Sequence, residues 1–211
     1  VILGVLANLF GLEPSSLKGV VRSRLGRRAE LVEKNLGALQ VGFDYARDKI
    51  KKTDPYYLTN GDHVGRLVMS GNEAIVAGAL LAGCRFYAGY PITPASDIME
   101  GMARELPPVG GVFMQAEDEI AAMAAVVGAA YAGRKAMTAT SGPGLSLMTE
   151  VLGLAAMADL PCVIVDSQRA GPSTGMPTKM EQGDLNLALW GGHGDVPRIV
   201  IAPGSVEDCF Y

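Results

Sequence analysis

Residues 84–106 read CRFYAGYPITPASDIMEGMAREL and contain the transition on which the fold depends. The apolar run CRFYAGY predicts a strand, and ASDIMEGMAREL predicts a helix that starts at Ala95 or Ser96. Between them lies YPITP, where two prolines stand in place of the usual Gly, Asn or Asp of a turn. Proline fixes φ and removes a donor, so this loop would hold the Thr93 hydroxyl in one direction. A rigid connector and a rigid grip on a ligand both fit this pattern.

Strands and helices continue to alternate along the chain from residue 66 onward. The sequence predicts further strands at GVFMQ (111–115), KAMTATS (135–141), PCVIVDSQ (161–168) and RIVIAP (198–203). It predicts further helices at NEAIVAGALLAG (72–83), EDEIAAMAAVVGAAYAG (117–133) and LSLMTEVLGLAAMA (145–158). Strands separated by helices of about a dozen residues are typical of an α/β fold, in which helices cover both faces of a parallel sheet.

The first part of the chain has a different pattern. Residues 1–50 are predicted to be helical, and residues 51–65, with their charges and glycines, are predicted to be a linker. The chain begins with Val1 and ends in GSVEDCFY, where Ser205 and Asp208 have the spacing of a capping box at a helix start. We therefore expect a fragment of a longer polypeptide, truncated at its C-terminus.

Composition narrows the class of protein. The chain has 211 residues, a formal net charge of −4 and no long basic run, which argues against a nucleic-acid surface. No apolar run is long enough to cross a bilayer, and no signal peptide is visible. We expect a protein that binds neither nucleic acid nor membrane.

Cysteine and histidine usage argues against a metal site in this chain. Cys84, Cys162 and Cys209 stand far apart and form no CxxC pair, so we expect buried or half-buried thiols in a reducing cytoplasm. His63 falls in the predicted linker, and His193, in GGHGD, is more typical of a structural role. No set of His and carboxylate residues has a metal-ligand spacing.

Polar or glycine-rich sequence follows four of the predicted strands: YPITP, QAEDE, TATSGPG and DSQRAGPSTG. The carboxyl ends of parallel strands lie at one edge of a sheet, where ligands bind in α/β folds. One such strand end would mean little, but four on one edge indicate a built site. TSGPG lacks the GxxxxGK pattern of a phosphate loop, which favours a tight strand-to-helix turn with close backbone approach.

Two of these strand ends carry charged candidates. Glu117, Asp118 and Glu119 could form an acidic helix start, but the apolar helix that follows could bury one carboxylate and suit it to proton transfer. Arg169 directly follows a predicted strand, and arginine commonly binds carboxylates. The segment after Arg169 could equally be a disordered surface loop.

Together, GYPITPASDIME, QAEDEIAAMAAVVGAAYAG, MTATSGPGLSLMTE and DSQRAGPSTGMPTKMEQGDL closely resemble the α chain of 2-oxoacid:ferredoxin oxidoreductases. The resemblance covers residues 66–211 and is greatest to the 2-oxoglutarate:ferredoxin oxidoreductase subgroup. Residues 1–50 resemble the tail of the γ domain in the fused γ–α form of these enzymes.

The resemblance implies a pyrimidine-binding domain for thiamine diphosphate. It implies a separate β chain that binds the diphosphate with Mg²⁺ and carries a 4Fe-4S cluster. Family spacing places the catalytic glutamate, which hydrogen-bonds the aminopyrimidine, at Glu119, with Glu117 as the reserve. The other residues matched to the family are Pro91 and Ile92 for the cofactor, and Thr93, Arg169, Ser173 and Thr174 for the 2-oxo acid substrate.

The implied reaction is oxidative decarboxylation of a 2-oxo acid to an acyl-coenzyme A, with electrons passing to ferredoxin. It requires the β chain, coenzyme A and ferredoxin as partners, in a homo- and hetero-oligomeric assembly. We expect 2-oxoglutarate as the substrate, with pyruvate and 2-oxoisovalerate as alternatives. Half of another thiamine diphosphate enzyme and a non-catalytic binding module are the competing hypotheses.

Overall fold

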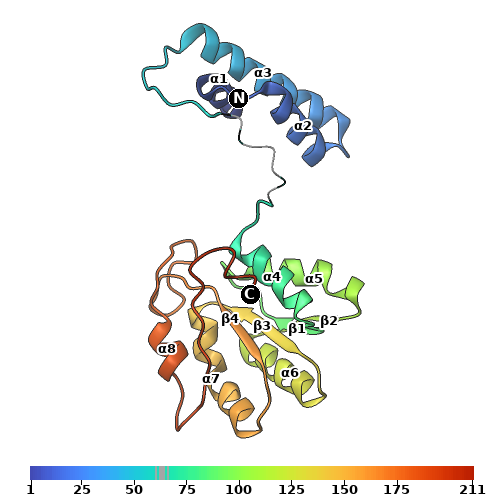
Figure 1. Cartoon of the computed structure of the whole chain (residues 1–211), viewed down its shortest axis with the longest axis vertical. Coiled ribbons are helices and arrows are strands. Elements are labelled where there is room, and N and C mark those ends of the chain that lie inside the picture. The colour runs from blue at the N-terminus through green and yellow to red at the C-terminus, as the bar shows by residue number, and fades with distance from the viewer. Residues whose placement is uncertain (60, 62–64, 66) are drawn as a thin grey trace. The chain divides into compact units, whose positions relative to one another are not determined.

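The computed structural model describes residues 1–59, 61, 65 and 67–211. The chain divides into two compact units, Val1–Arg66 and Leu67–Tyr211, which are drawn in Figure 1. The first unit contains helices α1 (Ile2–Phe10), α2 (Pro14–Leu25) and α3 (Ala29–Lys49). The predicted helical character of residues 1–50 is therefore confirmed. His63 of the predicted linker lies outside the described residues.

Helices α1 and α3 pack with almost no side chain between their backbones. A Cβ atom at Gly4 would collide with the Leu39 carbonyl, and one at Gly42 would collide with the Val1 carbonyl. Residues 51–59 form neither helix nor strand but fold back onto α1, where the Leu58 amide donates to the Phe10 carbonyl at 2.9 Å. The absence of side chains at the two glycines is thus what allows this helical unit to close.

The second unit is built on four parallel strands. Its elements are α4 (Gly71–Leu81), β1 (Phe86–Gly89), α5 (Ser96–Glu105), a 3₁₀ turn (Pro107–Val109), β2 (Val112–Gln115), α6 (Glu119–Tyr131), β3 (Ala136–Thr140), α7 (Gly142–Met157), β4 (Val163–Asp166) and α8 (Leu185–Trp190). The strand order is β2-β1-β3-β4, and all three pairings are parallel. The predicted α/β fold class is confirmed.

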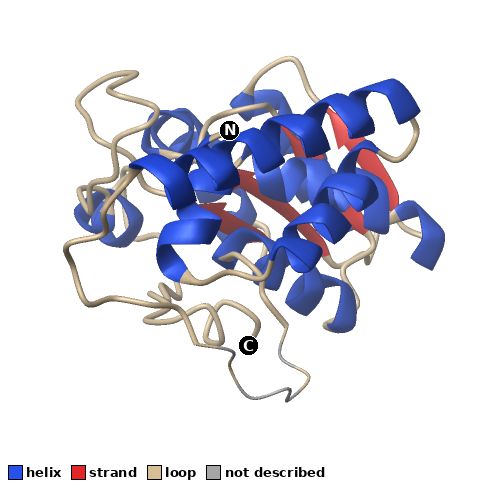
Figure 2. Ribbon diagram, turned by 90° about the horizontal axis from the view of Figure 1, so that it is seen from above, coloured by secondary structure: helices blue, strands red, loops and turns tan. Residues whose placement is uncertain are grey.

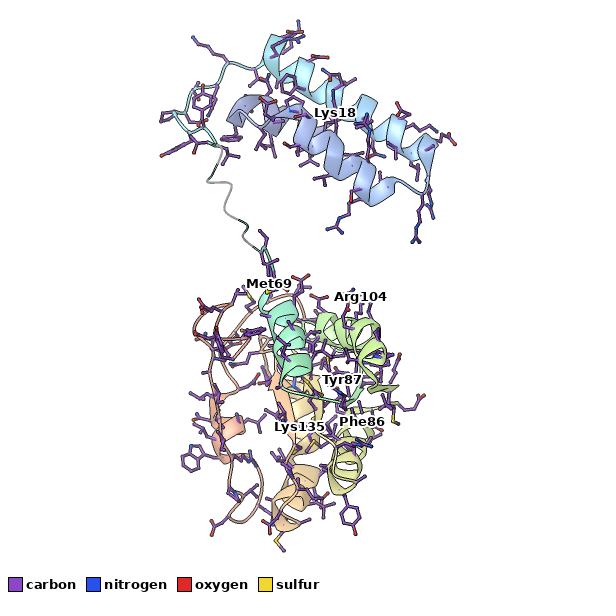
Figure 3. The ribbon with its side chains drawn as sticks, turned by 45° about the vertical axis from the view of Figure 1, so that its right-hand side comes forward. Lys18, Met69, Phe86, Tyr87, Arg104 and Lys135 are labelled. Carbon is purple, nitrogen blue, oxygen red and sulfur yellow. The ribbon has the colours of Figure 1, made fainter. Side chains whose placement is uncertain are left out.

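Helices cover both faces of this sheet (Figure 1, Figure 2). Phe86 and Tyr87, which are labelled in Figure 3, follow each other on β1 and therefore point to opposite faces. Tyr87 packs with Ile98 and Met102 of α5, whereas Phe86 packs against the cluster that contains Val126 of α6. Helices α4 and α5 thus lie on one face, and α6 and α7 lie on the other.

Local sequence explains where α4 begins. The Ser70 hydroxyl accepts from the Glu73 amide at 3.2 Å, and the Glu73 carboxylate accepts from the Ser70 amide at 2.7 Å. These two bonds form a capping box, which satisfies donors that a helix start would otherwise leave free. The end of the chain resembles this arrangement only in part, since the Asp208 amide donates to Ser205 Oγ at 3.1 Å within a run of turns.

One predicted strand is wrong. Residues 198–203 (RIVIAP) form no strand in the part of the chain that the structure describes, and Ile199 and Ile201 are 93% and 80% exposed. A strand exists only where a neighbouring backbone pairs with it, and the apolar alternation of this segment carries no information about such a neighbour. The sheet that is formed ends at β4.

Candidate functional site at the carboxyl edge of the sheet

The four strand-end loops meet at one edge because all four strands run in the same direction. Within this edge, β1 and β3 are neighbours, yet the helix that follows β1 covers one face and the helix that follows β3 covers the other. This reversal makes the ends of β1 and β3 a topological switch point, the place at which ligands of open α/β sheets bind. The loops that flank this switch point contain YPITP after β1 and SGPG after β3.

The three consecutive acids after β2 have three different environments. Asp118 is the N-cap of α6, and its side chain accepts from the Ala121 amide at 2.7 Å. Glu117 is exposed, and Glu119, the first residue of α6, is only 7% exposed. The helix-capping role therefore belongs to Asp118, and the buried carboxylate belongs to Glu119.

The Glu119 side chain lies against the beginning of α7. A Cβ atom built on Gly144 would be 2.7 Å from Glu119 Cγ and 2.9 Å from Glu119 Oε1, and it would also collide with Thr140 Oγ1. Among the described residues, no hydrogen bond to the Glu119 carboxylate is found. The residue is largely buried but its carboxylate oxygens are not fully enclosed by protein, so they can accept a hydrogen bond from a ligand that presents a donor.

Arg169 joins the loop after β1 to the loop after β4. Its Nη1 donates to the Thr93 carbonyl at 2.8 Å, and its Nη2 donates to the Thr174 carbonyl at 2.6 Å. The residue is 8% exposed, and its Nε is buried without a partner among the described residues. The structure thus brings together three of the residues that the sequence assigns to substrate binding.

The remaining predicted site residues lie on these two loops. Pro91 and Ser173 are exposed, and Ser173 has a positive φ of 58°. Ile92 packs against the apolar cluster around Tyr87, so its side chain anchors the loop. The same loop is held from the other side by Asn72, whose Nδ2 donates to the Pro94 carbonyl at 3.0 Å.

A second pair of acids at this edge escaped the sequence analysis. Asp166 ends β4 and Asp184 is the N-cap of α8; Asp166 Oδ1 and Asp184 Oδ2 are buried and unpaired among the described residues. Burial and the neighbouring Asp184 carboxylate raise the pKa of Asp166 to about 7. The Asp184 amide also donates to Gln168 Oε1 at 2.9 Å. This hydrogen bond between residues 168 and 184 joins the two ends of the loop that carries Arg169.

Other features of the chain were also located. Cys84 is buried, and Cys162 and Cys209 are half-buried, all as free thiols. His193 is exposed on the loop after α8. Within the described ranges, His, Cys, Asp and Glu side chains form no group of three suited to a metal ion. Over the same ranges, no helix has the length and apolar content of a bilayer span.

The parallel sheet with helices on both faces defines a doubly wound α/β domain, and Glu119 is buried at the carboxyl edge, where domains of this kind bind ligands. Residues 77–211 match the family described as pyruvate flavodoxin/ferredoxin oxidoreductase, thiamine diphosphate-binding. The chain belongs to this family. The predicted family and its thiamine diphosphate cofactor are thereby confirmed.

Individual relatives agree with this assignment. The 2-oxoglutarate synthase subunit KorA of Methanocaldococcus jannaschii is 59% identical over 142 residues, which cover 67% of this chain and 39% of that protein. The 2-oxoglutarate oxidoreductase subunit KorA of Mycobacterium tuberculosis is 41% identical over 218 residues, which cover 99% of this chain and 33% of that protein.

A solved structure is similar over nearly the whole chain. The 2-oxoglutarate:ferredoxin oxidoreductase from Magnetococcus marinus, solved with 2-oxoglutarate, coenzyme A and succinyl-CoA bound, is 47% identical with a TM-score of 0.89. The match covers 99% of this chain and 37% of that one. The present chain therefore spans between a third and two fifths of the length of these relatives.

Proposed function

We propose that this chain is part of the α subunit of a 2-oxoacid:ferredoxin oxidoreductase that converts 2-oxoglutarate and coenzyme A to succinyl-CoA and CO₂. Two electrons are released in this reaction and pass to ferredoxin. The observation that carries the proposal is Glu119, which is only 7% exposed and whose carboxylate makes no hydrogen bond among the described residues, at the carboxyl edge of the sheet. The relatives named for 2-oxoglutarate support this choice of substrate over pyruvate and 2-oxoisovalerate.

The residues of this edge fit the pyrimidine half of thiamine diphosphate. Glu119 would accept a hydrogen bond from the aminopyrimidine ring, because no described residue competes for its carboxylate. Pro91 and Ile92 would present the loop backbone to the same ring, with Ile92 fixed by its apolar contacts. When bound, thiamine diphosphate supplies the nucleophilic carbon and the electron sink that decarboxylation requires.

The loops joined by Arg169 would hold the substrate. The Arg169 guanidinium donates hydrogen bonds to the Thr93 and Thr174 carbonyls, so it fixes the position of both loops. Its remaining cationic surface would attract the substrate carboxylate, and the exposed hydroxyls of Thr93, Ser173 and Thr174 would donate to the substrate oxygens.

The proposed assembly needs a partner subunit, and the naming of the relatives as subunits supports one. A β chain would bind the diphosphate with Mg²⁺ and carry a 4Fe-4S cluster, and the assembly would be a homo- and hetero-oligomer in the cytoplasm. Residues 1–50 would be the end of a γ domain fused ahead of the α domain.

The test is anaerobic dye reduction by the full-length chain assembled with its β chain, thiamine diphosphate and Mg²⁺. We expect reduction that requires both coenzyme A and 2-oxoglutarate, and little reduction with pyruvate or 2-oxoisovalerate. Glu119→Gln should lower turnover at least about 100-fold with assembly intact. The matched control is Glu117→Gln, two residues away and exposed, which should retain activity.

Each alternative has its own outcome. Reduction with pyruvate or 2-oxoisovalerate in place of 2-oxoglutarate would keep the reaction class and change the substrate. No reduction by a complex shown to hold cofactor and cluster would favour another thiamine diphosphate enzyme or a binding module. Full activity of Glu119→Gln, or loss of activity in Glu117→Gln, would overturn the role given to Glu119.

A further inference from the structure

The SGPG turn at the start of α7 lies between two carboxyl side chains. A Cβ atom on Gly142 would be 2.6 Å from both carboxylate oxygens of Asp184. A Cβ atom on Gly144 would be 2.7 Å from Glu119 Cγ and would collide with Thr140 Oγ1. Gly142 therefore leaves space for the Asp184 carboxylate, and Gly144 leaves space for Thr140 and for Glu119, the carboxylate of the proposed active site.

A glycine at position 144 is explained by the space around it and not by its backbone conformation. Gly144 is buried and lies inside α7, where the backbone is helical and open to any L residue. Gly144 is the third residue of α7, in its first turn, and glycine is unfavourable there relative to alanine because it loses more backbone freedom on folding. The compensating feature at this site is the room that the missing side chain gives to Glu119 and Thr140.

Another glycine of the same helix gives the contrast. A Cβ atom on Gly153 would meet no atom of the described residues within 4 Å. Replacement by alanine adds the same methyl group at position 144, in the first turn of α7, and at position 153, in its middle, and the two positions differ in whether a neighbouring side chain must move.

We propose that Gly144 is a positioning residue for Glu119. The absence of a side chain at position 144 leaves the space in which the Glu119 carboxylate lies against the first turn of α7. The proposal rests on the function proposed for Glu119. The position has an electrostatic consequence, because Glu119 is the first residue of α6 and also contacts the N-terminal turn of α7. Two helix N-termini then face one carboxylate, and each attracts negative charge.

The first experiment compares Gly144→Ala with Gly153→Ala in the full-length complex. We expect Gly144→Ala to lower kcat at least tenfold while the KM for 2-oxoglutarate changes less than threefold. It should also weaken thiamine diphosphate binding and reduce the circular-dichroism signal of the bound cofactor. Gly153→Ala should match the wild type in all of these measurements. Equal behaviour of the two variants would overturn the proposal.

A second experiment does not depend on activity. The shift in denaturation midpoint caused by Gly144→Ala is measured in three backgrounds: wild type, Thr140→Ala, and the double variant Glu119→Ala/Thr140→Ala. We expect the loss to be largest in wild type, smaller in Thr140→Ala and absent in the double variant, because the competing atoms are removed in turn. If Thr140→Ala alone removes the whole loss, Gly144 makes room only for Thr140, and the proposal fails.

The two experiments separate the two possible failures. A wild-type complex without 2-oxo acid activity would refute the proposed function, and the denaturation series would still report whether residues 119 and 144 compete for space. An active complex whose denaturation series shows no coupling to Glu119 would refute the positioning role alone.

Discussion

Arg169 donates from Nη1 to the carbonyl oxygen of Thr93, 76 residues earlier in the chain, at 2.8 Å. The bond crosses the end of β3, since the loops concerned follow β1 and β4, which are not neighbours in the sheet. Through Nη2 the same guanidinium fixes the Thr174 carbonyl. One buried cation thus sets the spacing of the two loops that follow the strands on either side of β3.

Replacing Arg169 by lysine should release one of these loops. A lysine keeps the charge but lacks the planar fork that serves two carbonyls at once. We expect Arg169→Lys to lower the free energy of unfolding by about 1–3 kcal/mol and to raise the KM for 2-oxoglutarate about tenfold. Denaturant titration and steady-state kinetics of the complex measure the two effects.

Arg198 provides the matched control, because its Nη1 also donates to backbone carbonyls, those of Leu187 and Ala188, at 3.1 and 3.0 Å. Arg198→Lys should affect stability without a comparable change in KM. A KM that stays at the wild-type value in Arg169→Lys would show that the joined loops do not shape the substrate site.

The three acids after β2 should respond differently to substitution. Asp118→Ala removes the side-chain acceptor of the Ala121 amide and should cost about 1 kcal/mol of stability. Glu117→Ala removes an exposed side chain and should change stability by less than about 0.5 kcal/mol. Thermal and denaturant unfolding of both variants checks this order, and equal losses would contradict the separation of roles seen in the structure.

Stability should depend on pH through Asp166. An aspartate in an unfolded chain has a pKa of about 3.9, whereas the pKa of Asp166 in the fold is raised to about 7. The folded state therefore binds the additional proton between these values. The stabilisation is complete below about pH 4 and is lost as the pH rises through about 7.

We expect Asp166→Asn to flatten this part of the profile. The stability lost by the wild type between pH 4 and pH 7 through this group should be roughly 2 kcal/mol, below the full linkage value because solvent screens part of the side chain. Urea denaturation of the full chain at a series of pH values measures the slope. Asp195→Asn, at an exposed position, is the control and should keep the wild-type slope. A profile unchanged in Asp166→Asn would contradict the raised pKa.

Most of the fold could be predicted from local sequence. Alternating apolar runs placed β1 to β4 and α4 to α7, because strands and helices of this kind carry their periodicity in the chain itself. The failure at residues 198–203 has the opposite origin, since strand pairing depends on a neighbour that no local pattern encodes. The start of α7 at Gly142, three residues before the predicted start, has another reason: the glycines and proline of GPG are typical of a turn, yet proline is tolerated in the first turn of a helix.

The candidate site could be predicted where one residue type at one strand end carried the signal, as at Glu119 and Arg169. Pairs of residues that a long loop brings together could not be predicted from the sequence. Nothing in the sequence pairs Asp166 with Asp184, because 17 residues lie between them and only the folded loop brings them together. The roles assigned to the named site residues stay predictions until the variants are measured.

The hydrogen bonds of Arg169 end on main-chain oxygens of residues 93 and 174, and the two threonine side chains take no part in them. Any amino acid supplies the same carbonyl group. Substitutions at 93 and 174 can therefore change the chemistry offered to a substrate while the connection between the loops is preserved. The side chains at these two positions are therefore free to vary in evolution without loss of the connection between the loops.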